Sequence, residues 1–517
     1  MKQPKKVLNF INFVRGTDSL YDHETLLTAL RNELQYLKDY GIRSTVLLQY
    51  DALNDKDFRD LIEEYSKDGM IEVGLWIELV RSAYINAGVE WKGRDMEWDW
   101  IAEHCTLLGQ TPQNRIKLID EIMRAFKEHY GYYPSVVGQW VIDTFSLRYM
   151  SEKYGVEGFC MCKDQDGTDT FTLWGGYLFG AYYPSKDNMY VPAQNIENQI
   201  NAPIFRMLGS DPIYQYDMEL SVENGPQRPQ SVMSLEPVYL NRGGGLPKWV
   251  DWYLKENFND KALNFAYAQA GQENSFSWPR ISRGYPYQVE KISELIKAGE
   301  LEVLQFGETV KWFKDTYKQT PPTSSIAESD WKEEGRKTYW YENKNYRINL
   351  HKENERVWIR DWYIFDERYH ERYLDKALDT RSCNYDNLPV VDGYRWTGNG
   401  IRSGIYFKTE EGEEIVGETV YDKTEHGIVL SIVGEQGLKC CFEEDKIEFI
   451  GEKDFSLKWD SDDSARSVEY KIDAESIVME YNGFVYKMAV ESGLSYLENG
   501  KPIIKSVNGK IVLKIVR

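Results

Sequence analysis

The chain has 517 residues, with 62 Lys and Arg against 83 Asp and Glu and a formal net charge of −21 at pH 7. This charge disfavours nucleic-acid binding through a basic surface, and no apolar run approaches the roughly 20 residues of a membrane-spanning helix. Apolar residues make up 42% of the chain, enough for a sizeable core, so we expect a globular protein of about two domains.

The start of the chain and its cysteines predict a cytoplasmic location. The opening apolar stretch is interrupted by Asn9 and Asn12, which favours a first strand over a signal peptide. The six cysteines form no CxxC pair and are too sparse for a disulfide scaffold. Free thiols in a reducing compartment follow from that spacing.

From residue 7 to about 318, short apolar runs alternate with amphipathic stretches, as is typical of β-α-β-α units around a parallel sheet. The expected strands are 7–14, 44–50, 71–77, 135–142, 156–162, 203–208, 263–268 and 301–306. Between them, Asp22, Asn54 and Thr111 are candidate caps of three helices. The sequence therefore predicts an α/β fold whose residues 1–325 form a (β/α)8 TIM-like catalytic barrel.

After a Pro-rich link at residues 320–322 the pattern changes to short alternating runs with Asn-Gly, Glu-Gly and Asp-Gly turns. This pattern predicts an all-β sandwich over residues 326–517. We expect this accessory domain to support the barrel or to mediate formation of a homodimer.

The connections of the barrel are unequal in length. Helix-to-strand links are a few residues, whereas the strand-to-helix links at 79–110, 163–202 and 209–245 are long. In such a barrel the long links gather at the carboxyl ends of the strands, where active sites form. A seven-stranded or distorted barrel would show the same asymmetry.

Carboxylates that follow the expected strands are candidate catalytic groups. Glycosidic cleavage commonly uses one protonated carboxyl group and a second carboxylate as nucleophile or base. Asp18 after the first strand and Asp143 after the fourth are the preferred pair, with Glu78 in reserve. The alternative for both Asp residues is a helix N-cap, although Asp22 is better placed than Asp18 to cap the first helix. The alternative for Glu78 is a structural ion pair.

Other polar and aromatic residues at the strand ends are candidate sugar-binding groups. Arg206 ends an apolar strand and needs a carboxylate partner, which could be Asp211, Asp217 or an acidic group on the substrate. Aromatic rings there could stack on a sugar or belong to the core. The full predicted set is Arg15, Gln139, Trp140, Trp174, Arg206, Asp211, Tyr214, Gln215 and Glu273.

Metal and cofactor chemistry have little support in the sequence. The six histidines include no HxxxH or HxxH pair. Gly243, Gly244 and Gly245 lack the Gly-Lys-Ser/Thr of a phosphate loop, and no G-x-S-x-G elbow is present. We expect no metal and no cofactor.

Two segments resemble a known superfamily over roughly residues 6–325. The turn Gly131-Tyr132-Tyr133-Pro134 and the segment LEVLQFGETVKWFKDTYKQTPPTS look like the glycoside hydrolase and polysaccharide deacetylase barrels. Its deacetylases carry a His-x-x-x-His metal pair that this sequence lacks, which weakens the deacetylase interpretation.

Within that superfamily, NFVRGTD and FRMLGSDPIYQYD look more like two-domain barrel glycosidases, including the inverting exo-sialidases. That resemblance implies an Asp after the first strand and arginines that hold the sugar carboxylate, which Asp18, Arg15 and Arg206 fit. It also implies an Asp-x-His after the fourth strand, where this chain has Phe145 in place of His.

Together these observations predict a metal-independent, exo-acting glycoside hydrolase that removes a terminal sugar, with an acidic sugar such as sialic acid included among the candidates. Its partner is a glycan substrate. The alternatives are a catalytically silent carbohydrate-binding barrel and an atypical polysaccharide deacetylase. The sugar, the linkage and the stereochemical outcome are not fixed by the sequence.

Overall fold

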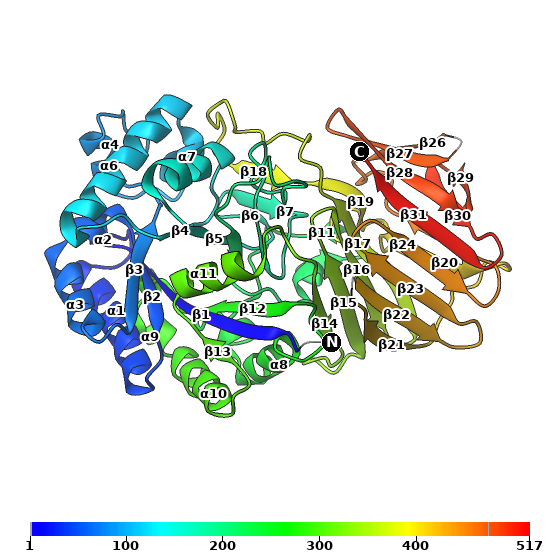
Figure 1. The fold of residues 1–517 in the computed structure, drawn as a ribbon, viewed down its shortest axis with the longest axis horizontal. Coiled ribbons are helices and arrows are strands. Elements are labelled where there is room, and N and C mark those ends of the chain that lie inside the picture. Colours follow the sequence, from blue (N-terminus) through cyan, green and yellow to red (C-terminus); the bar gives the residue numbers. More distant parts are fainter. Residues whose placement is uncertain (1–2, 426, 474) are drawn as a thin grey trace.

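The protein is seen in a computed structural model that describes residues 3–425, 427–473 and 475–517. One part has helices around a curled, mainly parallel sheet, and the other is built from antiparallel sheets (Figure 1). The first part takes up the amino-terminal 320 residues or so, and the second lies against it on one side.

All eight expected strands are present and run parallel. They are β1 (Lys5–Val14), β2 (Ser44–Leu48), β3 (Ile71–Trp76), β4 (Val136–Gln139), β5 (Gly158–Cys162), β9 (Ile204–Met207), β12 (Phe265–Ala270) and β13 (Glu302–Val303). Residues 7–14 of β1 are all buried, because side chains on both faces of such a sheet are covered. This double burial explains why the strands are continuous apolar runs in the sequence.

The sheet is curled but not closed as a regular (β/α)8 barrel. Its order is β12-β1-β2-β3-β4-β5-β9-β8, and within the described residues β9 and β12 share no backbone pairing. The free edge of β9 pairs instead with the antiparallel strand β8 (Ala181–Tyr182). Gln269 bridges the gap by accepting a hydrogen bond from the Leu208 amide at 2.9 Å, and Phe205 packs on Tyr267 beside it. The expected closure is therefore replaced by side-chain contacts.

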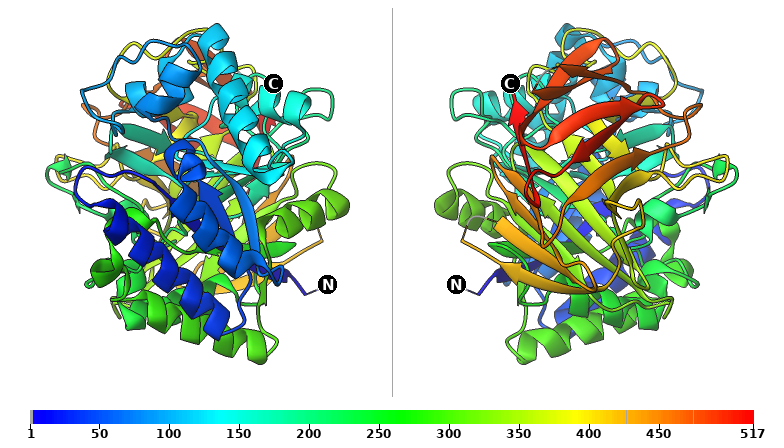
Figure 2. Two further views of the ribbon diagram at one scale, coloured as in Figure 1. Left: turned by 90° about the vertical axis from the view of Figure 1, so that its left-hand side faces the viewer. Right: turned by 90° about the vertical axis from the view of Figure 1, so that its right-hand side faces the viewer.

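Helices cover the outer side of this sheet (Figure 2, left). They are α1 (His23–Asp39), α2 (Tyr50–Asn54), α3 (Lys56–Ser66), α4 (Arg81–Asn86), α5 (Ala102–Cys105), α6 (Pro112–Tyr130), α7 (Thr144–Tyr154), α8 (Pro247–Asn257), α9 (Trp278–Ile281), α10 (Tyr285–Lys297) and α11 (Phe306–Thr316). Short 3-10 turns are η1 (Leu107–Gly109), η2 (Gln215–Asp217), η3 (Gly243–Gly245) and η4 (Asn274–Phe276).

Helix starts follow local capping chemistry. Asp22 caps α1 and Thr111 caps α6, as expected, each accepting a hydrogen bond from a backbone N–H of the first turn. The expected cap Asn54 is instead the last residue of α2, and Asp55 caps α3. The short helix α2 comes directly before α3, so the cap of α3 lies one residue later than expected. No helix within the described ranges is long and apolar enough to cross a membrane.

Two large antiparallel sheets form the second part (Figure 2, right). The first contains β14 (Thr323–Ala327), β15 (Arg336–Glu342), β16 (Tyr346–Glu353), β17 (Arg356–Ile364), β19 (Leu388–Asp392), β20 (Gly404–Thr409), β25 (Phe455–Asp460), β29 (Leu494–Glu498) and β30 (Lys501–Lys505). The second contains β21 (Glu418–Lys423), β22 (Gly427–Val433), β23 (Leu438–Glu443), β24 (Ile447–Gly451), β26 (Glu469–Asp473), β27 (Ser476–Tyr481), β28 (Phe484–Ser492) and β31 (Lys510–Val516). Apolar side chains from both sheets share one core.

Smaller sheets join the two parts. A three-stranded sheet places β18 (Cys383–Asp386) beside β7 (Phe171–Trp174), which pairs with β6 (Gln165–Thr168). Strands β10 (Leu220–Ser221) and β11 (Gly225–Pro226) form a small hairpin. Strands β6 and β7 lie in the long link after β5, so a segment from the second half of the chain completes a loop of the first.

Candidate functional site

A cavity of about 430 Å³ lies at the carboxyl ends of the parallel strands. Arg15 and Asp18 follow β1, Glu78 follows β3, Trp140 follows β4 and Glu273 follows β12. The rest of its lining is Ser19, Leu20, Tyr21, Trp98, Trp100, Cys162, Gln165, Thr168, Asp169, Phe171, Leu208, Ser231, Val232, Glu236, Tyr239, Ser275, Phe276 and Arg280. This end of the strands is where ligand sites form in parallel α/β folds.

Arg15 is the centre of a buried charge network in the cavity. Its Nε donates to Glu78 at 3.1 Å, and its Nη1 donates to Glu273 at 3.3 Å and to Ser275 at 3.0 Å. The Trp98 ring covers the guanidinium, whose carbon lies 4.0 Å from the ring centroid. One arginine thus holds two carboxylates that follow strands on either side of β1, namely β3 and β12, at nearly fixed positions.

Glu78 accepts more hydrogen bonds than any other carboxylate of this network. Besides Arg15, it accepts from Trp76 Nε1 at 3.1 Å and Trp140 Nε1 at 3.2 Å. Arg15 and the two indoles thus fix the position of the Glu78 carboxyl group, which lines the ligand space.

Glu236 has the opposite environment. Ser234 donates to one of its oxygens at 2.9 Å, and Gln272 lies 3.4 Å from the other, with no cation among these partners. Burial raises the pKa of Glu236 to about 7, and these two hydrogen bonds lower it by less. Near neutral pH a large share of this group is a neutral carboxylic acid that can donate a proton.

Three further carboxylates face the same space. Burial raises the pKa of Glu273, although the Arg15 guanidinium opposes this, and burial also raises the pKa of Asp169. Asp18 is only half-buried and accepts a hydrogen bond from the Leu20 amide at 2.7 Å through one oxygen. Its other oxygen accepts no hydrogen bond from the described residues, so it can contact water.

The lining combines aromatic rings with an excess of carboxylates. Trp98, Trp100, Trp140, Tyr21, Tyr239, Phe171 and Phe276 contribute rings, and rings of this kind stack on the apolar faces of sugars. Five carboxylates face two guanidinium groups, those of Arg15 and Arg280. The cavity therefore suits an uncharged, hydroxyl-rich ligand better than an anion.

Of the residues predicted from the sequence, Arg15, Asp18, Glu78, Trp140 and Glu273 line this cavity together. They come from four different strand ends, as the layout of a parallel sheet requires.

Asp143 does not join them. It caps α7, accepts hydrogen bonds from the Ser146 amide and hydroxyl at 2.8 and 2.6 Å, and forms a buried ion pair with Arg115 at 2.9 Å. Both side chains of the ion pair are fully buried. All the contacts of Asp143 are structural, so the expected pairing of Asp18 with Asp143 is absent.

Arg206 is also engaged elsewhere. Its guanidinium donates to the backbone carbonyls of Cys162 and Tyr177 at 2.9 and 2.6 Å and lies 3.4 Å from Asp164. Its carboxylate partner is therefore Asp164, in place of the expected Asp211, Asp217 or substrate. A buried arginine saturated in this way cannot reach a ligand.

Trp174 and Asp211 are buried and form hydrogen bonds with other segments of the chain. The Trp174 indole donates to Asp392 at 3.0 Å in the interior. Asp211 accepts hydrogen bonds from the indoles of Trp249 and Trp331, each at 2.9 Å. Neither residue lines the cavity.

Tyr214, Gln215 and Gln139 lie outside the lining as well. Tyr214 donates to Asp330 at 2.8 Å, and Gln215 accepts from the Met233 amide at 2.6 Å. Gln139 is buried in the sheet interior, and its amide has no hydrogen-bond partner in the described part of the chain.

Several of the cavity residues that sequence reasoning missed lie inside the long links. Trp98 and Trp100 come from the link 79–110, Asp169 from 163–202 and Glu236 from 209–245. The only signal was the length of these links, because a loop without periodicity does not reveal which of its side chains point inward.

The donor set of the cavity does not fit a histidine-based metal site. Its lining contains no histidine. Within the described ranges, the group of side chains with metal-ligand spacing is His23, Asp55 and Asp57, none of which lines the cavity. No step is therefore assigned to a metal ion.

Comparisons with known proteins agree at the level of the fold. No family model and no curated protein matches the sequence. A solved structure described as a candidate glycoside hydrolase/deacetylase from Parabacteroides distasonis is similar over 74% of this chain and 89% of its own, with a TM-score of 0.50 and 15% identity. A candidate polysaccharide deacetylase from Mycobacterium smegmatis covers 61% of this chain and 92% of its own, with a TM-score of 0.37 and 11% identity. The first match shows that this architecture occurs in another protein.

Proposed function

We propose that this protein is a carbohydrate-active hydrolase that cleaves the glycosidic bond of a terminal sugar bound in the cavity. The observation that carries the proposal is a cavity with two buried carboxyl groups in different surroundings: Glu236, whose pKa burial raises to about 7, and Glu78, which accepts hydrogen bonds from Arg15 and two indoles. A buried carboxyl group with a raised pKa is suited to act as a general acid. A cavity of about 430 Å³ suits one or two sugar rings.

The roles follow from proton state and access. Glu236 donates its proton to the leaving glycosidic oxygen as the C–O bond breaks. Asp18, which keeps an accessible oxygen, takes a proton from the water whose oxygen bonds to the anomeric carbon. The fixed charge of Glu78 stabilises the positive charge that develops on the sugar ring.

The charge balance favours an uncharged sugar over an acidic one. A sialidase uses arginines to hold the sugar carboxylate, whereas Arg15 already holds Glu78 and Glu273 and Arg206 is buried against Asp164, which leaves Arg280 as the remaining guanidinium of the lining. The carboxyl groups of the lining that are ionised would also repel an anionic ring.

A deacetylase is the second candidate, because the similar solved structure with a TM-score of 0.50 is described as a glycoside hydrolase/deacetylase. It would release acetate from an acetylated glycan. Loss of acetate release in the presence of a chelator would favour this candidate over the first.

A panel of aryl glycosides tests the proposal. We expect the wild type to hydrolyse an uncharged glycoside and Glu236→Gln to lower kcat by 10²-fold or more, in line with loss of a general acid. Asp18→Asn should lower kcat as well, whereas Glu152→Gln, on the exposed side of α7, should leave it unchanged. Sugar binding without turnover in the wild type would indicate a silent binding barrel and contradict the proposal.

A further inference from the structure

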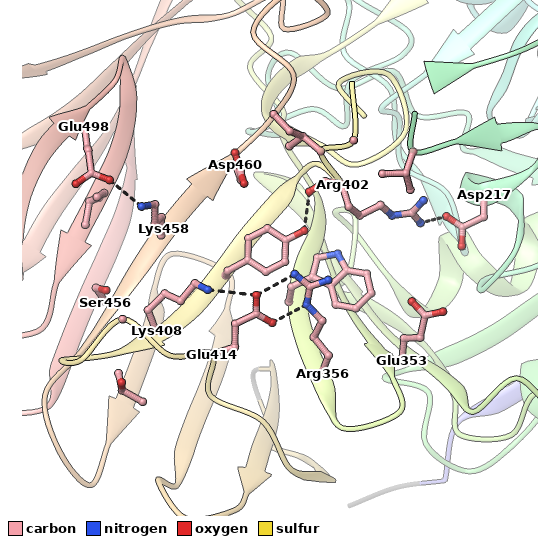
Figure 3. A pocket seen from close by; sticks show the side chains of 18 of the residues that line it. Asp217, Glu353, Arg356, Arg402, Lys408, Glu414, Ser456, Lys458, Asp460 and Glu498 are labelled. Atoms are coloured by element: carbon pink, nitrogen blue, oxygen red, sulfur yellow. Dashed lines mark hydrogen bonds and ion pairs between the residues drawn. The ribbon is translucent and has the colours of Figure 1, made fainter. Parts of the chain in front are cut away.

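A second cavity, of about 1100 Å³, lies on the antiparallel part of the molecule (Figure 3). Its floor is one face of five neighbouring strands, β17, β20, β25, β30 and β29. Side chains alternate along these strands: Phe407 and Leu457 enter the core between the two large sheets, whereas Tyr406, Lys408 and Lys458 line the cavity. The floor is thus the face of the sheet that points away from this core. We call the cavity the sheet groove.

Further along, the same face of the sheet packs against the amino-terminal part of the protein with the curled parallel sheet. We call this the barrel part, its cavity the barrel cavity, and the antiparallel part the sheet part. On β17, Arg360 donates to the Ile213 carbonyl at 2.8 Å, whereas Arg356 and Trp358 on the same face line the groove. Residues 217–222 of the barrel part contribute to one wall. The groove therefore begins where the barrel stops covering the sheet, and such junctions are common binding sites.

Charge in the sheet groove is balanced and largely paired. Seven Lys and Arg side chains and seven Asp and Glu side chains line it. Arg356 donates to Glu414 at 2.6 Å, and Lys458 donates to Glu498 at 2.7 Å, as Figure 3 shows. A groove of this kind exerts little net attraction on an anion or a cation, but it offers charged donors and acceptors side by side, which suit hydroxyl groups.

Two buried aromatic rings underlie the floor of the groove, and one further ring is exposed in it. The rings of Trp358 and Tyr406 lie 6.3 Å apart at 26°, with the Arg356 guanidinium over both. Trp358 Nε1 is buried and donates to no partner in the described structure, and its edge lies over Gly404, where a side chain would collide with it. Tyr496 is 38% exposed at the other side of the groove. Trp358 and Tyr406 are buried beneath Arg356, so Tyr496 is the ring of this groove that a sugar can stack on.

We propose that the sheet groove binds a chain of uncharged sugars, a polysaccharide segment, at a site separate from the barrel cavity. Its volume exceeds the roughly 300–1,000 Å³ typical of small-molecule sites, so it has room for several sugar units. The choice of a glycan over another uncharged polar polymer rests on the proposed function of the barrel. The groove would hold the polymer to which the terminal sugar belongs.

Affinity electrophoresis of the full chain tests this proposal, with soluble starch, xylan, mixed-linkage β-glucan and galactomannan as uncharged probes and polygalacturonate as an anionic one. All variants carry Glu236→Gln so that no probe is degraded. We expect at least one uncharged probe to slow migration. Tyr496→Ala and the double change Lys458→Ala with Glu498→Ala should each weaken this binding at least tenfold. Lys311→Ala with Asp315→Ala, an exposed ion pair on α11, is the matched control.

Binding that is unchanged in both groove variants, or confined to polygalacturonate, would overturn the proposal, as would the absence of binding to every uncharged probe. Turnover of small aryl glycosides, measured in the groove variants with Glu236 restored, separates the two proposals. Small substrates should be hydrolysed at the wild-type rate in these variants. If the wild type binds polysaccharide without any turnover, the proposal for the sheet groove stands and the proposed hydrolase activity is contradicted.

Discussion

Glu236 and Glu78 face one cavity in different chemical environments. Glu78 has an arginine and two indole N–H groups as donors, whereas Glu236 has a hydroxyl and a distant amide. Glu78 thus has a cationic partner, whereas burial is the largest influence on the pKa of Glu236 and raises it. The two carboxyl groups of one cavity therefore differ in the donors that surround them.

The pH dependence of activity should report Glu236. The acid form donates the proton, and burial raises its pKa to about 7. We therefore expect kcat/KM for an uncharged aryl glycoside to fall tenfold per pH unit above about pH 7. In Glu236→Gln the remaining activity should lose this alkaline limb, which pH–rate profiles of both proteins would measure. An unchanged alkaline limb in the variant would exclude Glu236 as the acid.

Glu236 should also affect stability, in a direction set by the sign of its shift. Its pKa in the folded state lies above the ordinary value of 4.5, so the folded protein binds more protons than the unfolded chain between about pH 4.5 and 7. The free energy of unfolding should fall as pH rises through that window, by roughly 3 kcal/mol from this group. The variant Glu236→Gln lacks this loss. Its free energy of unfolding should therefore rise relative to that of the wild type as the pH increases from 5 to 8.

Urea unfolding at pH 5 and pH 8 would measure this gain. Glu152→Gln, which changes an exposed carboxylate, should differ from wild type by the same small amount at both pH values. Equal effects of the two substitutions at both pH values would contradict the buried, protonated state of Glu236.

At the scale of single elements, α7 depends on Asp143. Its carboxylate both caps the helix and neutralises the buried Arg115. Asparagine preserves the cap but not the charge, so Asp143→Asn should lower the free energy of unfolding by about 3–5 kcal/mol, as expected when a buried ion pair loses one partner. Turnover per folded molecule should stay within about twofold of wild type. A large loss of kcat in folded Asp143→Asn would instead restore a catalytic role.

The elements of the sheet could be predicted from the sequence, because their signal is local. All eight expected strands are present; seven of them are short runs that are largely buried, whereas the eighth, β13, is a two-residue strand that is partly exposed. Sheet closure was not predictable. It depends on whether β9 and β12 approach each other, and the side chain of Gln269 and the extra strand β8 decide this at long range. Local patterns carry no information about such contacts.

The site could be predicted only in part, for a similar reason. Arg15, Glu78 and Glu273 follow strands directly, so the position of the strand fixes the position of the residue. Asp143 follows a strand too, but a buried arginine from another helix binds it. Glu236 lies in a link of irregular structure, where its inward direction depends on contacts with Ser234 and Gln272 that the sequence does not reveal.

At the scale of the whole molecule, the two parts share a buried interface. Asp164 of the barrel part binds Arg347 on β16 at 2.6 Å, and both side chains are fully buried. Glu342 on β15 accepts hydrogen bonds from the Leu178 and Phe179 amides at 2.8 and 2.6 Å. Buried charges and backbone groups of the barrel part thus depend on the sheet part for their partners.

A chain that ends at residue 322 should therefore fail to fold as an independent unit. We expect no cooperative thermal unfolding by circular dichroism, and rapid cleavage by a protease within residues 163–190, because that segment loses its partners. The full-length protein is the control. A truncated chain that unfolds cooperatively and hydrolyses an aryl glycoside would show that the interface is dispensable.

The pairing of β7 with β18 has a consequence for how the protein matures in the cell. Gln165, Thr168, Asp169 and Phe171 on and between β6 and β7 line the barrel cavity, yet their neighbouring strand β18 begins only at Cys383. At typical rates of synthesis the ribosome needs roughly 10–40 s to make the intervening stretch. Until then the nascent barrel carries an unfinished wall with an open strand edge. The wall of the cavity is thus completed late during translation, only after β18 has been made.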